Sequence, residues 1–307
     1  MFTHLLVPLD GSSLAEAVLP YVRLLGAQPG ARVTLLHLIE RGAPASIHGE
    51  RHLRSVADAD TYLREVAAAL VADGVIVETH VDTNEAGDTA GRIVDHASEW
   101  GADLTILCAH GRSGVGRWLF GSIAQRVLAV GIAPVLLVRP EAGRARTPIM
   151  LHTILVPLDG TANAEVTLPL VANIARAMDA RVELFMVIPT TDTLSGAMSS
   201  VARFSPNVTT TLLNDAEKAA VEYLDTCMRR LCDSGVTTTA TVTRGDTADE
   251  LVAAAKTTHA DIVAMASHGR QGLAGIWAGS VGNKVLARVN GPFLLIRAPG
   301  APRDLLD

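Results

Sequence analysis

The segment Leu5–Gly11, which reads LLVPLDG, decides the fold because the chain contains it twice. It recurs as Ile154–Gly160, which reads ILVPLDG. In each copy a continuous apolar run of strand length ends in an aspartate and a glycine, a pattern typical of a buried strand that runs into a turn. The chain is therefore a tandem duplication, and whatever one half binds the other half could bind too.

A glycine motif follows each copy at a distance. The first half has HGRSG at His110–Gly114 and then Gly121-Ser122, and the second half has HGRQG at His268–Gly272 and then Gly279-Ser280. The two strand-end aspartates lie 149 positions apart, whereas Gly121 and Gly279 lie 158 positions apart. The two copies therefore differ only by modest insertions between shared anchor regions.

Length and composition agree with two similar domains. A chain of 307 residues is long enough for roughly two domains. The polar stretch Glu141–Pro148 places the join, and we expect one domain over residues 1–145 and another over residues 149–300. Hydrophobic residues make up 49% of the chain but aromatic residues only 4%, which is usual for helices that cover a buried parallel sheet.

Strand and helix patterns alternate through both halves. In the first half we expect strands at His4–Leu9, Val33–Ile39, Val75–Val81, Leu104–Ala109 and Val135–Arg139, and helices at Ser12–Leu25, Leu53–Asp73, Ala90–Glu99 and Ser122–Val130. In the second half we expect strands at Thr153–Leu158, Arg181–Ile188, Thr237–Thr243, Ile262–Ala266 and Phe293–Arg297, and helices at Glu165–Met178, Asp215–Ser234, Asp246–Thr258 and Ser280–Arg288. This order predicts α/β architecture: two doubly wound domains, each a five-stranded parallel sheet with helices on both faces.

One stretch of the second half has no counterpart in the first. Residues between Pro189 and Asn214 are rich in Thr, Ser, Gly and Asn. Such a composition favours a surface loop, and it leaves a lid open as an alternative.

Charge and cysteine content exclude several classes of function. The net charge is −6 and no run of Lys or Arg exceeds two or three residues, so the chain lacks the basic surface that nucleic acids attract. No apolar stretch approaches the roughly 20 residues that span a bilayer, which predicts a cytoplasmic protein. Cys108, Cys227 and Cys232 form no C-x-x-C pair, and we interpret them as reduced packing residues.

The glycine motif is the first candidate for binding chemistry. Gly111 and Gly114 allow backbone conformations and close approaches that a side chain would block. Gly121-Ser122 begins a predicted helix, whose free N–H groups and positive dipole end favour an anion such as a polyphosphate. The alternative is that the glycines only turn a loop and that Ser122 only caps the helix. The same spacing in both halves favours the phosphate interpretation.

The strand-end aspartates are the second candidate. Asp10 and Asp159 could accept hydrogen bonds from ribose hydroxyls or hold a metal ion. Aspartate before Gly-Ser is also a common turn and helix cap, which needs no ligand. Ligands of doubly wound sheets bind beyond the carboxyl ends of the strands, where the strand order reverses, and both aspartates are expected there.

Taken together, these motifs resemble the universal stress protein family in its tandem two-domain form. The resemblance covers essentially the whole chain and rests on VPLDGS after strand one, on GDTA at residues 87–90 and 245–248, on the HGRxG loops with Gly-Ser, and on the final segments Ala133–Val138 and Gly291–Ile296. It implies a fold like that of the adenine-nucleotide alpha-hydrolases, an ATP site with an accompanying Mg²⁺ or Mn²⁺, and terminal strands that pair across a two-fold axis within the chain. A further homodimer and an unidentified protein partner stay open.

The resemblance also implies which residues contact the nucleotide. In the first half they are Pro8, Asp10, Gly111, Arg112, Ser113, Gly114, Gly121, Ser122 and Ile123, and in the second half Pro157, Asp159, Gly269, Arg270, Gln271, Gly272, Gly279, Ser280 and Val281. The nucleotide-binding branch of the family carries glycine, two residues, glycine, nine residues, then glycine and Ser or Thr. The first glycine of that pattern is Cys108 in one half and Ala266 in the other. Because a sulfur narrows a pocket more than a methyl group does, the second half is expected to be the better site.

Three functions follow from these residues. The leading one is an ATP-binding sensor or regulator of the stress response. The second is a slow ATPase or nucleotide hydrolase, which needs a general base and a metal-bound water, and only Asp10 and Asp159 are candidates. The third is an interaction module whose pockets have decayed. No catalytic residue is predicted.

Overall fold

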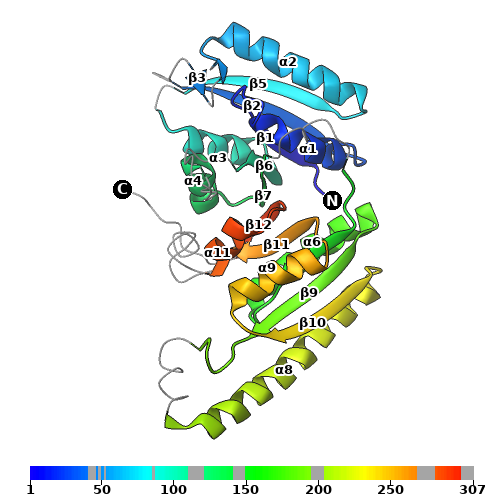
Figure 1. Cartoon of the computed structure of the whole chain (residues 1–307). Coiled ribbons are helices and arrows are strands. Elements are labelled where there is room, and N and C mark those ends of the chain that lie inside the picture. Colours follow the sequence, from blue (N-terminus) through cyan, green and yellow to red (C-terminus); the bar gives the residue numbers. More distant parts are fainter. Residues whose placement is uncertain are drawn as a thin grey trace.

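The computed structural model describes residues 1–40, 46–47, 50–51, 53–84, 87–109, 121–140, 149–194, 204–267 and 281–298. Within this part of the chain, ten strands from both halves form one continuous sheet (Figure 1). Helices cover both faces of that sheet, so the expected α/β architecture is confirmed.

Each half contributes five parallel strands. They are β1 (His4–Pro8), β2 (Arg32–Glu40), β5 (Val77–Asn84), β6 (Leu104–Cys108) and β7 (Val135–Val138) in the first half, and β8 (Thr153–Pro157), β9 (Arg181–Ile188), β10 (Thr238–Arg244), β11 (Ile262–Ser267) and β12 (Phe293–Arg297) in the second. The sheet order is β10-β9-β8-β11-β12-β7-β6-β1-β2-β5. The first strand of each half therefore lies at the centre of that half, between its second and fourth strands. A separate two-stranded ribbon pairs β3 (Ser46–Ile47) with β4 (Glu50–Arg51).

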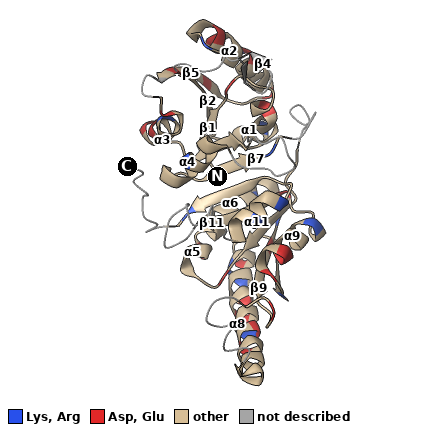
Figure 2. Ribbon diagram, turned by 60° about the vertical axis from the view of Figure 1, so that its left-hand side comes forward, with Lys and Arg blue, Asp and Glu red and all other residues tan. Residues whose placement is uncertain are grey.

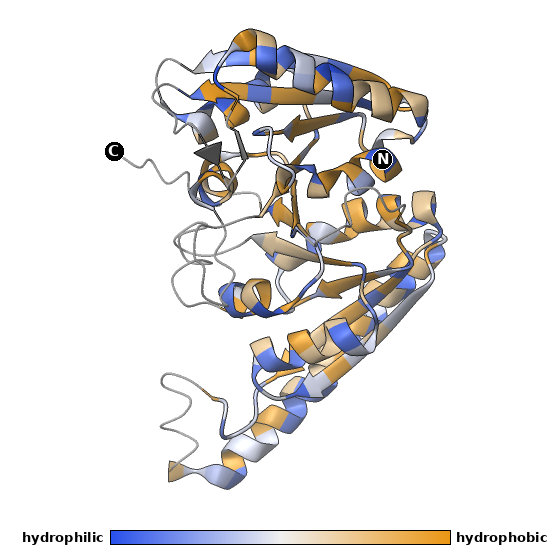
Figure 3. Ribbon diagram, turned by 45° about the horizontal axis from the view of Figure 1, so that its top comes forward, coloured by the Kyte–Doolittle hydropathy of each residue, from blue (hydrophilic) through white to orange (hydrophobic). Residues whose placement is uncertain are grey.

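The two largest buried clusters, one on each face of the sheet, hold most of the helices in place. The first-half helices are η1 (Ala15–Val18), α1 (Leu19–Gly26), α2 (Val56–Ala72), α3 (Thr89–Glu99) and α4 (Ser122–Val130), and the second-half helices are α5 (Ala162–Glu165), α6 (Thr167–Met178), α8 (Pro206–Asp233), α9 (Thr247–Thr257) and α11 (Val281–Arg288). Helices α1, α2, α6 and α8 pack on one face, and α3, α4, α9 and α11 pack on the other. Successive strand residues point to opposite faces, so Leu5 and Leu6 enter different clusters. This explains why inner strands such as β1 and β8 are mostly apolar (Figure 3).

The helix expected at Ser12–Leu25 is divided in two. A 3₁₀ turn, η1, comes first and α1 begins at Leu19. Pro20 lies in the first turn of α1, where a missing N–H costs nothing, but it cannot donate to the carbonyl of Glu16 as a continuous α-helix would require. The proline therefore sets the boundary between the two pieces.

The loop expected between Pro189 and Asn214 is partly wrong. Helix α8 begins at Pro206, nine residues before the predicted start, so the threonine run at 209–211 is helical. Each of these three threonine hydroxyls donates to the carbonyl four residues earlier, at 3.1, 3.0 and 3.0 Å. Acidic and basic residues are interspersed along the rest of α8 (Figure 2). None of the helices in the described part combines the length and apolarity needed to cross a membrane.

The two halves join through their last strands, as expected. β7 and β12 pair antiparallel, with Leu136 opposite Leu294 and Leu137 opposite Phe293. Leu136 and Leu294 are equivalent residues of the two copies, 158 positions apart, so the pairing is symmetric about this central pair. The pairing within one chain is confirmed.

Candidate functional site

The strand order fixes where a ligand would bind in each half. From β1 the chain moves to β2 on one side and later returns to β6 on the other. The order thus reverses between β1 and β6, and in the second half between β8 and β11. The carboxyl ends of these strand pairs are the usual ligand position in doubly wound sheets. Asp10 follows β1 and Asp159 follows β8, so both predicted aspartates lie there.

Each aspartate orders the turn that follows its strand. Oδ1 of Asp10 accepts the N–H of Ser12 at 2.9 Å and its hydroxyl at 2.6 Å. Oδ1 of Asp159 accepts the N–H of Thr161 at 3.0 Å and its hydroxyl at 2.6 Å. The two hydroxyl oxygens in turn accept backbone N–H groups of the next helical turn, those of Ala15 and Ala164. The turn-forming role is therefore real in both halves, and it fixes the carboxylates in equivalent positions.

The glycine after each aspartate has a left-handed backbone. The φ angle is +85° at Gly11 and +80° at Gly160, a region that other L-residues rarely adopt. The surroundings differ, because a Cβ at Gly11 would lie 2.6 Å from Cδ1 of Leu53, whereas one at Gly160 would lie 3.7 Å from Cε of Met186. The turn is therefore more tightly enclosed in the first half.

His37, which was not among the predicted site residues, contributes to that enclosure. It lies on β2, is 1% exposed, and its Nδ1 donates to the carbonyl of Leu9 at 2.8 Å. The register of β1 with β2 and of β8 with β9 places Met186 at the equivalent position of the second half. The sequence signal for this residue was a single histidine within the apolar run of β2. Through its hydrogen bond to Leu9, His37 holds the end of β1.

Cys108, which replaces a glycine of the family pattern, closes against the turn of the first half. Its thiol donates to the carbonyl of Leu14 at 3.0 Å. Burial, and next the charge of Asp10, raise the pKa of the thiol well above its ordinary value. Cys108 is therefore a protonated thiol that bridges the end of β6 and the segment after β1. Ala266 occupies the equivalent position near the end of β11 and is half-buried.

The start of α4 differs from the prediction in the residue that caps the helix. The N-cap of α4 is Gly121, and no side chain of the described residues caps this helix. Ser122 is the first helical residue and is exposed, so its role as an N-cap was wrong. Ile123 and Val281, the next predicted contacts, are each 39% exposed. The side chains of Ile123 and Val281 are thus partly exposed at the starts of α4 and α11.

Ion pairs tie these two helices to their neighbours. Arg126 of α4 pairs with Asp88, the N-cap of α3, at 3.0 Å. Arg288 of α11 pairs with Asp249 in the first turn of α9. Asp88 and the corresponding Asp246 both cap their helices through backbone N–H groups, which explains why the GDTA segment occurs twice.

The remaining predicted site residues divide into two groups. Pro8 and Pro157 end β1 and β8 and are half-buried at the expected strand ends. The others lie outside the described residues: Gly111, Arg112, Ser113, Gly114, Gly269, Arg270, Gln271, Gly272, Gly279 and Ser280. Within the described ranges no three His, Cys, Asp or Glu side chains gather as a metal site.

A polar cluster on β5 and α3 was not anticipated. Asp82 accepts from His96 Nε2 at 2.8 Å and from Arg92 Nη2 at 2.7 Å. The His96 ring stacks on Trp100, with 4.3 Å between centroids, and the His80 ring meets both edge-on. Burial alone would raise the pKa of Asp82, but the hydrogen bonds from His96 and Arg92 outweigh it, so the pKa is lowered. The strand register places His80 level with Pro8, and β2 lies between β5 and β1.

The two halves match one family model twice. The model of the universal stress protein family covers residues 1–139 and residues 150–297. The chain belongs to the universal stress protein family. Universal stress protein YxiE of Bacillus subtilis is 24% identical over 151 residues, covering 45% of this chain and 100% of the relative. Universal stress protein Sll1388 of Synechocystis is 28% identical over 154 residues, covering 45% of this chain and 98% of the relative.

Solved structures agree at the level of the fold. The crystal structure of a universal stress protein from Archaeoglobus fulgidus superposes with a TM-score of 0.69, covers 96% of each chain and is 17% identical. The likeness therefore extends over both halves. The curated relatives each correspond to about half of this chain, so it is a tandem universal stress protein.

Proposed function

We propose that this universal stress protein binds ATP where β8 meets β11, and more weakly where β1 meets β6, and that it acts as a sensor or regulator in the stress response. The observation that carries the proposal is the coincidence, in both halves, of an ordered strand-end aspartate with the strand-order reversal. The Gly-Ser segment that begins the next helix supports it.

The chemistry of these groups suits a nucleoside triphosphate. At the start of α4 the backbone N–H groups have no capping side chain among the described residues, and the positive end of the helix dipole favours phosphate oxygens. The fixed carboxylates of Asp10 and Asp159 are acceptors for ribose hydroxyls. In the sequence, Gly279-Ser280 directly precedes Val281, the first residue of α11.

The difference between the halves follows from one position in each. Cys108 fills the end of β6 and contacts Leu14 across the strand-order reversal. Ala266 brings only a methyl group to the equivalent position. Less space in the first half weakens phosphate binding there, which makes the second half the principal site.

A Mg²⁺ or Mn²⁺ ion accompanies the phosphates in this proposal. The described residues offer no three-carboxylate cage, and Mg²⁺ is usually held by one or two carboxylates together with substrate phosphates and water. Asp10 and Asp159 are the carboxylates that follow β1 and β8, the strands at the reversal of strand order. The protein would work in the cytoplasm, where ATP and free thiols such as its three cysteines coexist.

The test begins with the purified protein. Mass spectrometry of the denatured sample identifies any nucleotide that co-purifies, and titration with a fluorescent ATP analogue measures affinity. Ser280→Glu places a negative charge in the phosphate position and should remove the tighter site, whereas Ser280→Gln, which has the same size and no charge, should weaken it less. A negative charge beside the amino end of a helix stabilises the helix, so loss of binding would not reflect unfolding.

Two results would contradict the proposal. Absence of both co-purified nucleotide and saturable binding would leave the interaction module as the better function. Steady phosphate release that disappears in Asp159→Asn would instead identify a hydrolase.

A further inference from the structure

Two equivalent arginines end the strands that join the halves. Arg297 is the last residue of β12 and Arg139 directly follows β7, and they lie 158 positions apart, as other equivalent residues of the two copies do. Because β7 and β12 run antiparallel, the end of each strand projects over the opposite half. Each arginine therefore reaches a helix of the other half.

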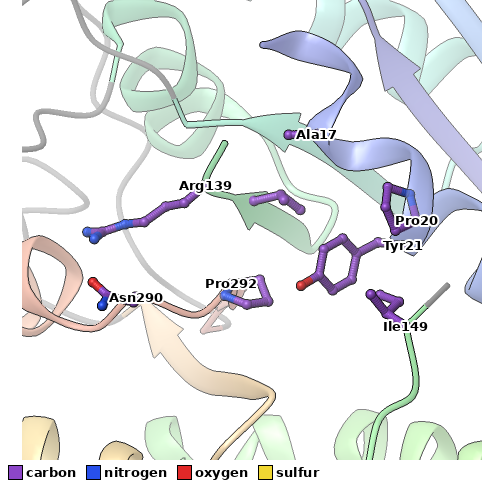
Figure 4. A pocket seen from close by; sticks show the side chains of 8 residues that line it. Ala17, Pro20, Tyr21, Arg139, Ile149, Asn290 and Pro292 are labelled. Carbon is purple, nitrogen blue, oxygen red and sulfur yellow. The ribbon is translucent and has the colours of Figure 1, made fainter. Parts of the chain in front are cut away.

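The contacts of these arginines cross between the halves. Nη1 of Arg297 donates to the carbonyls of Ala129 and Gly131, at 2.9 and 3.0 Å, at the carboxyl end of α4. Nη2 of Arg139 donates to the carbonyl of Leu286 in the last turn of α11. In Figure 4 the Arg139 side chain extends toward Asn290, which lies just beyond α11. The two contacts are thus reciprocal.

Charge and burial make these contacts costly to lose. The last carbonyls of a helix lack partners within the helix, and the helix dipole favours a cation there. Arg139 is only 8% exposed, and burial lowers its pKa, so its guanidinium depends on the acceptors that it finds. The adjoining hollow beside Tyr21 and Pro292 has room of about 10 Å³, enough for roughly one water, so it offers no ligand site of its own.

Helices α4 and α11 are also the two whose amino ends begin at Gly-Ser. They have nine and eight residues, so about 13 Å separates the carboxyl end that the arginine holds from the amino end at the proposed phosphate position. A short helix moves as a rigid rod, and a shift at one end therefore reaches the other.

We propose that Arg139 and Arg297 are positioning residues that couple the two sites: each half sets the position of the phosphate-binding helix in the other half. This inference rests on the proposed ATP site. ATP bound at the start of one helix then favours the arrangement of β7 and β12 in which the arginines hold both helices. Because coupling between two sites is reciprocal, each site changes the ATP affinity of the other by the same factor.

The chain supplies a matched control for the contact. Nη2 of Arg181 donates at 3.2 Å to the carbonyl of Thr258, the C-cap of α9. This is the same kind of contact, but arginine and helix belong to the same half, and α9 does not begin at Gly-Ser. Arg181→Gln removes one arginine from a helix end without touching the crossed contacts.

The first experiment needs no nucleotide. Hydrogen exchange, followed by mass spectrometry of peptides, is compared for Arg139→Gln, Arg297→Gln and Arg181→Gln. The inference expects a crossed pattern, in which Arg297→Gln speeds exchange in α4 and Arg139→Gln speeds exchange in α11. Arg181→Gln should affect α9 only. Faster exchange confined to the half that carries the substitution would overturn the inference.

The second experiment measures affinity at one site at a time. In the Ser122→Glu background, which leaves the second-half site, Arg139→Gln should weaken ATP binding about five- to tenfold, and Arg181→Gln should change it less than twofold. Arg139→Lys keeps the charge and should recover most of the affinity. Equal ATP affinity in the Ser122→Glu protein with and without Arg139→Gln would overturn the coupling. The coupling would also be overturned if Arg181→Gln weakened ATP binding as much as Arg139→Gln does.

The two experiments separate failure of the inference from failure of the proposed function. If the unsubstituted protein does not bind ATP, the proposed function is wrong, and the coupling between ATP affinities is wrong as well. The exchange pattern would still decide whether each arginine holds the helix of the other half.

Discussion

Replacing the glycine of each strand-end turn with alanine should affect the two halves unequally. An L-residue in the left-handed region costs about 1–2 kcal/mol, and the stiffer unfolded chain returns about 0.4–1 kcal/mol. Gly160→Ala, whose Cβ would meet only Met186 at 3.7 Å, should therefore lose about 1 kcal/mol. At Gly11 the new Cβ would lie 2.6 Å from Leu53, and overpacking of this kind adds about 1–3 kcal/mol. We expect a total loss of about 2–4 kcal/mol for Gly11→Ala.

The assay must report each half separately. Peptide-level hydrogen exchange in increasing urea gives the free energy of opening for each half of the same molecule. Gly30→Ala is the control for backbone strain alone, because φ is +79° there and no atom lies within 4 Å of a new Cβ. Equal losses for Gly11→Ala and Gly160→Ala would refute the reasoning, since they would show that Leu53 moves aside at no cost.

Three further predictions concern the polar cluster and Cys108. Burial, and next the charge of His96, lower the pKa of His80 below 6.5, so the unfolded chain binds more protons between the lowered pKa and pH 6.5. Stability of the first half should fall as pH drops through this window, and His80→Phe should flatten the fall in urea midpoint between pH 7 and pH 5. An unchanged pH profile would contradict this assignment. Asp82→Asn should cost the first half about 2–4 kcal/mol at pH 7, because His96 and Arg92 lose a charged acceptor in a site where Asp82 is 14% exposed. Since a lowered Asp pKa contributes stability above about pH 4 that is lost as pH falls through the folded pKa, the difference between Asp82→Asn and the parent should shrink in strong acid; a constant difference would argue against it. In the Ser280→Glu background, Cys108→Gly should strengthen ATP binding in the first half about three- to tenfold, measured by titration, and no gain would mean that the thiol is not what limits that site.

Most of the fold could be predicted because its strands are covered on both faces. Buried parallel strands such as β1 and β8 read as unbroken apolar runs, and their predicted ends lie within one residue of the observed ends. The pairing of the last strands also followed from the sequence through the resemblance. The start of α8 did not, because its threonines satisfy their hydroxyls inside the helix, a contact that composition does not reveal.

The candidate site could be predicted in part. The aspartates were found because a repeated strand-end residue has a fixed place in the topology. His37 and the Cys108 contact with Leu14 were not, because both depend on segments that are distant in sequence and adjacent only after folding. The glycine loops themselves lie outside the described residues, so their phosphate contacts stay a prediction.

The symmetric pairing of β7 and β12 has a consequence for how this interface can change. In a pair of identical chains, one substitution would appear twice, once on each side of the two-fold axis, and the contact would have to fit itself. Here Leu137 faces Phe293 while the equivalent Leu295 faces Val135, so the same position has already acquired partners of different size. Because the two halves are covalently joined, their effective concentration for each other does not change when the protein is diluted. Duplication within one chain has therefore freed each side of the interface to mutate alone.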